Sequence, residues 1–160
     1  MCLALYIGSA KELPEIKYGE VSKEVFQSPE WPAVAQRFTV SALNEGQEVV
    51  RKHFSVPFVS FAGSYEGCSC GFNYGREYPE YDDDKEHQRA AQESIVELVR
   101  YIRDHEVEEI YACWFDDESL PLETIRKASL DDLSSPTFMF KQKGLIKLTM
   151  PPNNAPKPAG

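Results

Sequence analysis

Hydrophobic residues follow two patterns along the chain, an unbroken run typical of a buried strand and a period of three to four residues typical of a helix. Residues 2–7 (CLALYI) are apolar at every position, which favours an interior strand covered on both faces. From about 84 to 104, acidic residues crowd the first turn and apolar residues recur every three or four positions, at Ala91, Ile95, Leu98 and Ile102. This second pattern predicts a long amphipathic helix with one buried stripe.

Shorter elements are predicted on both sides of the long helix. Asn44 and Gln47 have the spacing of a capping box, which predicts a short helix over about 45–53. The remaining apolar runs predict strands at 37–43, 56–62, 68–74 and 107–115, and a closing hairpin built from 138–140 and 145–150.

These elements together predict an α+β fold. We expect residues 1–150 to form a single domain, in which a mostly antiparallel sheet carries one long helix (about 84–104) and one short helix (about 45–53). Residues 151–160 contain four prolines, which lack a backbone donor, and we expect them to form a proline-rich tail after the domain.

The overall charge narrows the class of partner. A formal net charge of −9 repels a phosphate backbone, so neither nucleic acid nor an anionic membrane is an expected partner. The apolar run at 2–7 is too short for a membrane span and has no basic flank of a signal peptide. We therefore expect a cytoplasmic protein with free thiols, whose partner is a protein or a small polar ligand.

Residues 64–87 (SYEGCSCGFNYGREYPEYDDDKEH) concentrate tyrosines, glycines, two cysteines and an acidic run. Exposed tyrosines give large, rigid contact area, and the acidic run adds charge beside them. Our leading hypothesis is a non-enzymatic, acidic binding or interaction domain that uses the 65–84 segment. Its binding residues are Tyr65, Tyr74, Tyr78, Tyr81 and Asp82. In the competing interpretation, Tyr74 and Tyr78 pack beneath the loop and the acidic residues only begin the helix.

The pair Cys68 and Cys70 in the same segment has three interpretations. In a strand both side chains point to one face, which favours two small apolar side chains packed in the core. A second interpretation is a zinc site, for which one intervening residue is an uncommon spacing and further ligands are needed. The candidates for these ligands are Cys2, His87, Cys113 and the acidic residues at 82–84. A reactive or redox thiol is the third. No other cofactor is expected.

Cys2 supports a separate hypothesis. Removal of Met1 would expose an N-terminal cysteine whose own amine acts as the base, as in N-terminal nucleophile hydrolases. The competing interpretation is a core cysteine of the first strand. No serine-centred elbow, HExxH motif or acidic metal loop occurs in the sequence, so the balance favours a protein that is not an enzyme.

Three stretches of the chain carry a family resemblance. They are MCLALYI at the start, GSYEGCSCGFNYGREYPEY in the middle and YACWFDDESLP before the closing segment. Together they resemble a family of small uncharacterized bacterial proteins to which no activity is assigned. The resemblance spans most of 1–150, with GCSCGF as its most specific part, and it implies a self-contained domain.

Overall fold

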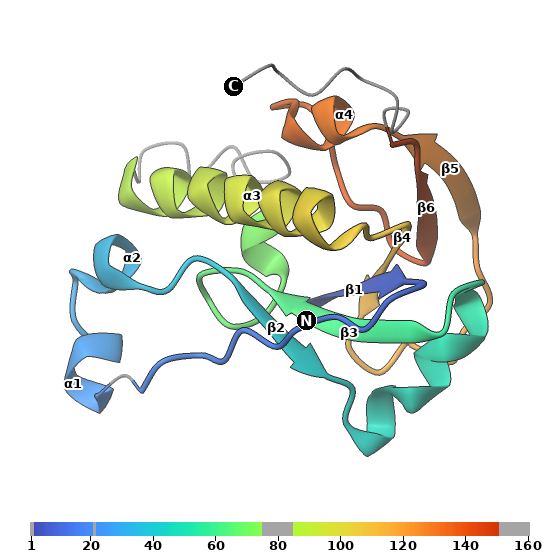
Figure 1. The fold of residues 1–160 in the computed structure, drawn as a ribbon. Coiled ribbons are helices and arrows are strands. Elements are labelled where there is room, and N and C mark those ends of the chain that lie inside the picture. Colours follow the sequence, from blue (N-terminus) through green and yellow to red (C-terminus); the bar gives the residue numbers. More distant parts are fainter. Residues whose placement is uncertain (1, 21, 75–84, 151–160) are drawn as a thin grey trace, which may run out of the picture.

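A six-stranded sheet forms the centre of the molecule (Figure 1). The structure is a computed structural model that describes residues 2–20, 22–74 and 85–150. The strand order is β2-β3-β1-β4-β6-β5, and every pairing between these strands is antiparallel except the parallel pair β5 and β6. The strands are β1 (Leu3–Ser9), β2 (Thr39–Ala42), β3 (Phe58–Gly63), β4 (Glu109–Trp114), β5 (Thr124–Ala128) and β6 (Gly144–Leu148).

Strand β1 lies inside the sheet and is buried on both faces, as its unbroken apolar run predicts. Leu3, Leu5 and Ile7 belong to the larger core cluster, while Ala4 and Tyr6 belong to a second cluster. Successive side chains of a strand point to opposite faces, so one strand contributes to both cores. The two clusters therefore lie on the two faces of the sheet.

The helices cover the two faces unequally. Helix α3 (Lys85–His105) lies over one face, where its apolar stripe joins the larger core (Figure 1). The 3₁₀ helix η1 (Glu45–His53) packs on the second cluster through Val50, and it begins with the capping box predicted for Asn44 and Gln47. The remaining helices are short: α1 (Lys23–Phe26), α2 (Trp31–Val34), η2 (Cys70–Phe72) and α4 (Leu130–Ser134). The predicted α+β fold is confirmed.

Two predicted strands are wrong. Residues 68–74 form a turn and the single turn of η2, in which Phe72 is fully buried against the larger core. Residues 138–140 form no strand, and β6 pairs instead with β4 and with β5. Short apolar runs have the composition of a strand whether or not a partner strand is within reach, so periodicity alone does not separate these cases.

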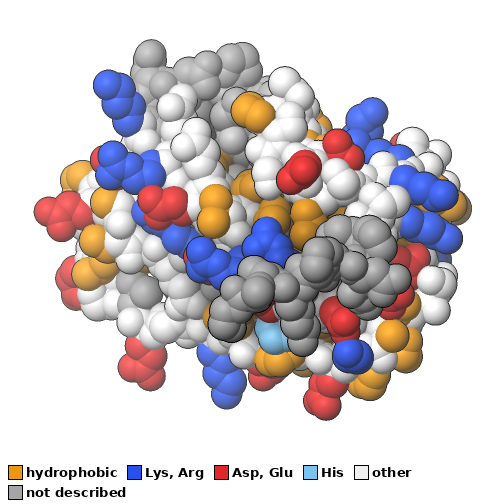
Figure 2. All heavy atoms as spheres, turned by 45° about the horizontal axis from the view of Figure 1, so that its top comes forward, with side chains coloured by type: hydrophobic (Ala, Val, Ile, Leu, Met, Phe, Trp, Pro, Cys, Tyr) orange, Lys and Arg blue, Asp and Glu red, His pale blue; other side chains and the backbone are white. Residues whose placement is uncertain are grey.

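Charged side chains of both signs are interspersed on the face shown in Figure 2. The net charge of −9 is therefore not gathered there into one acidic field. Within residues 2–20, 22–74 and 85–150, no helix has the length and apolar character needed to cross a membrane. The predicted tail at 151–160 lies outside the described residues.

Candidate functional site

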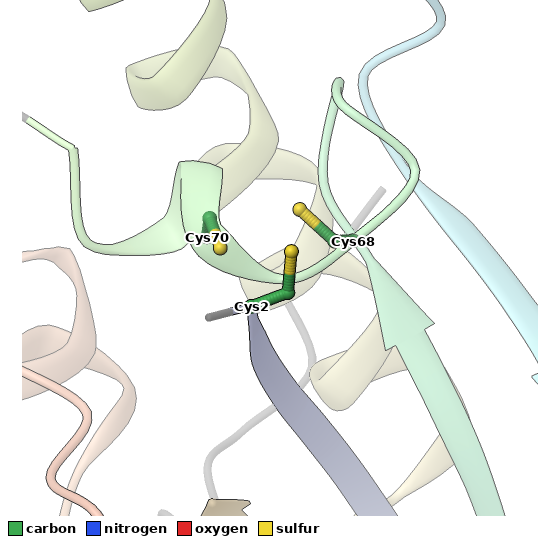
Figure 3. Close-up of side chains that lie close together, drawn as sticks. All are labelled: Cys2, Cys68 and Cys70. Atoms are coloured by element: carbon green, nitrogen blue, oxygen red, sulfur yellow. The ribbon is translucent and has the colours of Figure 1, made fainter. Parts of the chain in front are cut away.

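Three cysteine side chains converge where the start of β1 meets the turn that follows β3 (Figure 3). The sulfur atoms of Cys2, Cys68 and Cys70 all lie within 4.8 Å of one another. All three are free thiols, with Cys2 exposed and the other two partly exposed. The pair is therefore not an inward-facing part of a strand, and solvent reaches the group.

Ser69, between two of these cysteines, is fully buried and joins the turn to the sheet. Its hydroxyl accepts a hydrogen bond from the Leu5 N–H at 2.8 Å and donates one to the Ala62 carbonyl at 2.6 Å. Its own N–H donates to the Leu3 carbonyl at 3.1 Å. Ser69 therefore anchors the turn to the sheet, while its two neighbours remain partly exposed.

Two glycines allow the chain to fold this tightly. Gly67 has a φ of 83°, a backbone conformation that glycine adopts without a steric penalty. At Gly71 a Cβ atom would lie only 2.4 Å from the Ser64 Oγ, so only glycine fits without a shift. That Oγ donates to the Cys68 carbonyl at 2.7 Å and accepts the Gly71 N–H at 3.1 Å. Ser64 therefore fixes the backbone on both sides of the Cys68–Cys70 pair.

The third cysteine is positioned by the neighbouring strand. The carbonyl of Cys2 accepts the Phe115 N–H at 3.0 Å, which extends the pairing of β1 with β4 by one residue. The next N–H along β1, from Leu3, donates to the sulfur of Cys70 at 3.1 Å. The start of β1 therefore contributes both a thiol and a backbone donor to the same group.

Cys68 and Cys70 differ in acidity. The pKa of Cys70 is lowered to about 6, chiefly by a hydrogen bond from the Cys68 thiol, with further help from the Leu3 N–H and the Cys2 thiol. The pKa of Cys68 is raised, because its thiol is engaged with Cys70 and is partly desolvated. Of these two thiols, Cys70 is therefore the one that ionises more readily.

A small polar group lies beside the sulfurs. The Tyr74 hydroxyl donates to Glu66 Oε2 at 3.1 Å, and Glu66 Oε1 lies 3.9 Å from His87 Nδ1. His87 Nδ1 is also 2.7 Å from the Tyr65 hydroxyl. The negative charge of Glu66 raises the pKa of Cys70, which places this carboxylate within electrostatic reach of the thiols.

The predicted metal ligands that the structure describes separate into two sets, and the acidic residues at 82–84 lie outside the described residues. Cys2, Cys68 and Cys70 come together, whereas Cys113 is fully buried in the second core cluster. Burial raises the pKa of Cys113 to about 12. His87 contacts Glu66 and Tyr65, and no histidine, aspartate or glutamate of the described chain joins the group of three sulfurs.

The predicted tyrosine surface is described only in part. Tyr65 is fully buried, and Tyr74 is partly buried with its ring centroid 6.2 Å from that of Tyr65. Tyr65 therefore adds no exposed area to a surface. Tyr78, Tyr81 and Asp82 lie outside the described residues, so the surface they form stays a prediction.

Sequence reasoning missed the positioning residues. Nothing in the sequence around Ser69 or Ser64 indicates that either side chain is buried. Gly67 and Gly71 were the available signal, because glycines placed this densely are typical of a turn.

The comparisons with known proteins leave the site to be interpreted from its own chemistry. No protein-family model matches the chain, and neither the curated proteins nor the solved structures include a match.

Proposed function

We propose that the protein binds a thiophilic metal ion through Cys2, Cys68 and Cys70. The observation that carries the proposal is the mutual approach of three free sulfurs to within 4.8 Å. Metal–thiolate bonds of about 2.3 Å around one ion place sulfurs about 3.8 to 4.0 Å apart, so only a small adjustment is needed.

The chemistry of the donors supports a metal. Thiolates are soft ligands that favour ions such as Zn²⁺ and Cu⁺ over Mg²⁺ and Ca²⁺. Three neighbouring thiolates would repel one another, and a bound cation removes that repulsion while releasing the thiol protons. A reducing cytoplasm, which the cysteine usage favours, keeps such thiols available for binding.

The nearby carboxylate favours a cation as well. Glu66 affects the acidity of both Cys68 and Cys70 through its charge. One of its oxygens accepts the Tyr74 hydroxyl, the other lies near His87, and neither joins the group of three sulfurs, so we expect Glu66 to act on the ion through its charge.

Metal titration of the reduced protein tests the proposal. We expect one ion of Cd²⁺ or Zn²⁺ per chain, seen as charge-transfer absorption for Cd²⁺ and by elemental analysis after desalting. Replacement of Cys2, Cys68 or Cys70 by Ser should weaken binding more than about 100-fold, because outer-shell partners alone change metal affinity by about 10- to 100-fold.

The chain offers a matched control in its fourth cysteine. Cys113 lies in the second core cluster, away from the group of three, so Cys113→Ala should bind metal as the wild type does. Binding of less than about one ion per ten chains at saturating metal, or equal loss in all four variants, would reject the metal site.

A reactive thiol is the second candidate, and the hydrogen bond from the Leu3 N–H to the Cys70 sulfur favours it. The Cys70 thiolate would attack a substrate disulfide and release one thiol. The Cys68 thiol would then displace the second thiol and leave a Cys68–Cys70 disulfide, so that the substrate gains two electrons and two protons. A metal-free protein that reduces a model disulfide, with loss in Cys70→Ser, would favour this candidate.

A further inference from the structure

We infer that the ion preferred by Cys2, Cys68 and Cys70 is a monovalent, three-coordinate one of the Cu⁺ class rather than Zn²⁺. This inference rests on the proposed metal-binding function and concerns the identity of its ligand. It follows from the composition of the group, which consists of three sulfurs and no nitrogen or oxygen ligand among the described residues.

The number of donors distinguishes the two ions. Zn²⁺ in structural sites takes four protein ligands, and in open sites a water completes a shell of three. Cu⁺ is a closed-shell, soft ion that is satisfied by three thiolates, and thiolate donors favour it strongly. Within the part of the chain that the structure describes, the group ends at three sulfurs, which completes the shell of Cu⁺ and leaves that of Zn²⁺ one protein ligand short.

Glu66 and His87, two described residues with possible ligand atoms, are held in other contacts. The carboxylate of Glu66 accepts the Tyr74 hydroxyl at 3.1 Å. The Nδ1 of His87 lies 2.7 Å from the Tyr65 hydroxyl, and Tyr65 is fully buried. Each of these residues therefore has a hydrogen-bonding role outside the group of three sulfurs.

A backbone donor holds one of the three sulfurs in place. The Leu3 N–H donates a hydrogen bond to the Cys70 sulfur at 3.1 Å. This bond offsets part of the negative charge of the thiolate. Such outer-shell donors fix the orientation of a ligating atom and adjust its strength. Because Leu3 is the first residue of β1, this donor is held by the sheet.

Competition between the two ions tests the inference. The reduced full chain is loaded with Zn²⁺ and titrated anaerobically with Cu⁺ buffered by a chromophoric chelator, and the product is examined by X-ray absorption at the copper edge. We expect Cu⁺ to displace Zn²⁺ at one ion per chain and to show a shell of three sulfurs. Cys2→Ser, at an exposed position that does not threaten the fold, should reduce the shell to two sulfurs.

The outcomes separate the inference from the proposed function. Zn²⁺ that stays bound under excess Cu⁺, or a copper shell containing nitrogen or oxygen in the wild type, overturns the inference and leaves the metal site standing. Failure of both ions to bind overturns the two together. Cys113→Ala should show the wild-type shell, and a changed shell in that variant would assign the copper to a different set of sulfurs.

Discussion

The Ser69 hydroxyl accepts the backbone N–H of Leu5 at 2.8 Å, deep within the sheet. The same oxygen donates to the Ala62 carbonyl, so one side chain joins β1 to β3. The two cysteines that flank Ser69 are held next to this junction and remain partly exposed. A residue without metal chemistry of its own therefore sets the geometry of the thiols.

Replacement of Ser69 by Ala should lower both stability and metal affinity. The Leu5 N–H and the Ala62 carbonyl would lose their partner, and a buried unsatisfied group costs about 1 to 3 kcal/mol. Urea unfolding should show this loss, and metal affinity should fall about 10-fold as the thiols lose their support. Ser41→Ala, at an exposed position of β2, should change neither quantity. Wild-type affinity in Ser69→Ala would show that the turn holds its shape without the serine.

Replacement of Gly71 by Ala should disturb the site by steric conflict. The added Cβ would lie 2.4 Å from Ser64 Oγ and 2.8 Å from a ring carbon of Tyr65, so either the turn or these side chains must shift. Overpacking of this kind costs about 1 to 3 kcal/mol, to be measured by chemical denaturation alongside metal titration.

Gly46 provides the matched comparison for that substitution. A Cβ there would meet only Asn44 Oδ1 at 3.5 Å, an ordinary contact. Gly46→Ala should therefore be neutral, or stabilising by about 0.4 to 1 kcal/mol because it restricts the unfolded chain. If both alanine variants behave alike, close packing at Gly71 is not what holds the turn.

The elements that could be predicted from sequence are those with a long, regular period. The stripe of α3 and the apolar run of β1 each extend over enough residues to specify a helix or a buried strand. The run at 68–74 is short, and its course is decided by the Ser64 hydroxyl, which bonds within the turn to the Cys68 carbonyl, and by the Ser69 hydroxyl, which accepts the distant Leu5 N–H. Such tertiary hydrogen bonds leave no periodic trace.

The site was predictable only as a list of alternatives. Sequence spacing identified Cys68 and Cys70 as a pair, and the candidates for further ligands were Cys2, His87, Cys113 and the acidic residues at 82–84. The choice among these depends on strand pairing, because Cys2 is fixed by β4 and the turn is fixed by β1 and β3. Cys113 is directed into the opposite core by the alternation of β4.

In the metal-free protein, Cys70 should react with alkylating agents faster than the other cysteines. Hydrogen bonds from the Cys68 thiol and the Leu3 N–H lower its pKa to about 6, so its thiolate predominates at neutral pH. Short pulses of iodoacetamide between pH 5 and 8, followed by peptide mass spectrometry, should give a rate midpoint near that value. Equal labelling of Cys68 and Cys70 would contradict the assignment.

The carboxylate of Glu66 should oppose that reactivity. Its negative charge raises the pKa of Cys70, so Glu66→Gln should lower this pKa further and increase alkylation on the acidic side of the midpoint. Glu45→Gln, at an exposed position at the start of η1, removes the same charge elsewhere and should leave the rate unchanged. Slower alkylation in Glu66→Gln would mean that the carboxylate acts through the structure of the turn rather than through its charge.

The metal-free protein should lose stability as the pH falls below about 6.5, and His53 should account for part of that loss. Burial lowers the pKa of His53 from its usual 6.5, and its Nε2 lies 2.8 Å from the Glu118 carbonyl, to which it donates when neutral. Between the folded pKa and pH 6.5, the unfolded state binds a proton that the folded state does not. The contribution of His53 to the free energy of unfolding is therefore complete above pH 6.5. It declines from there until the pH reaches the folded pKa.

Urea unfolding at several pH values with a chelator present measures this dependence. His53→Gln removes the titrating group and should make the acid-side decrease in unfolding free energy shallower. The same substitution should also lower stability at pH 8, because the ring centroid of His53 lies 4.4 Å from that of Tyr111 and this packing would be lost. An unchanged slope in His53→Gln would assign the acid sensitivity to other groups, because a histidine that titrates alike in both states contributes no slope.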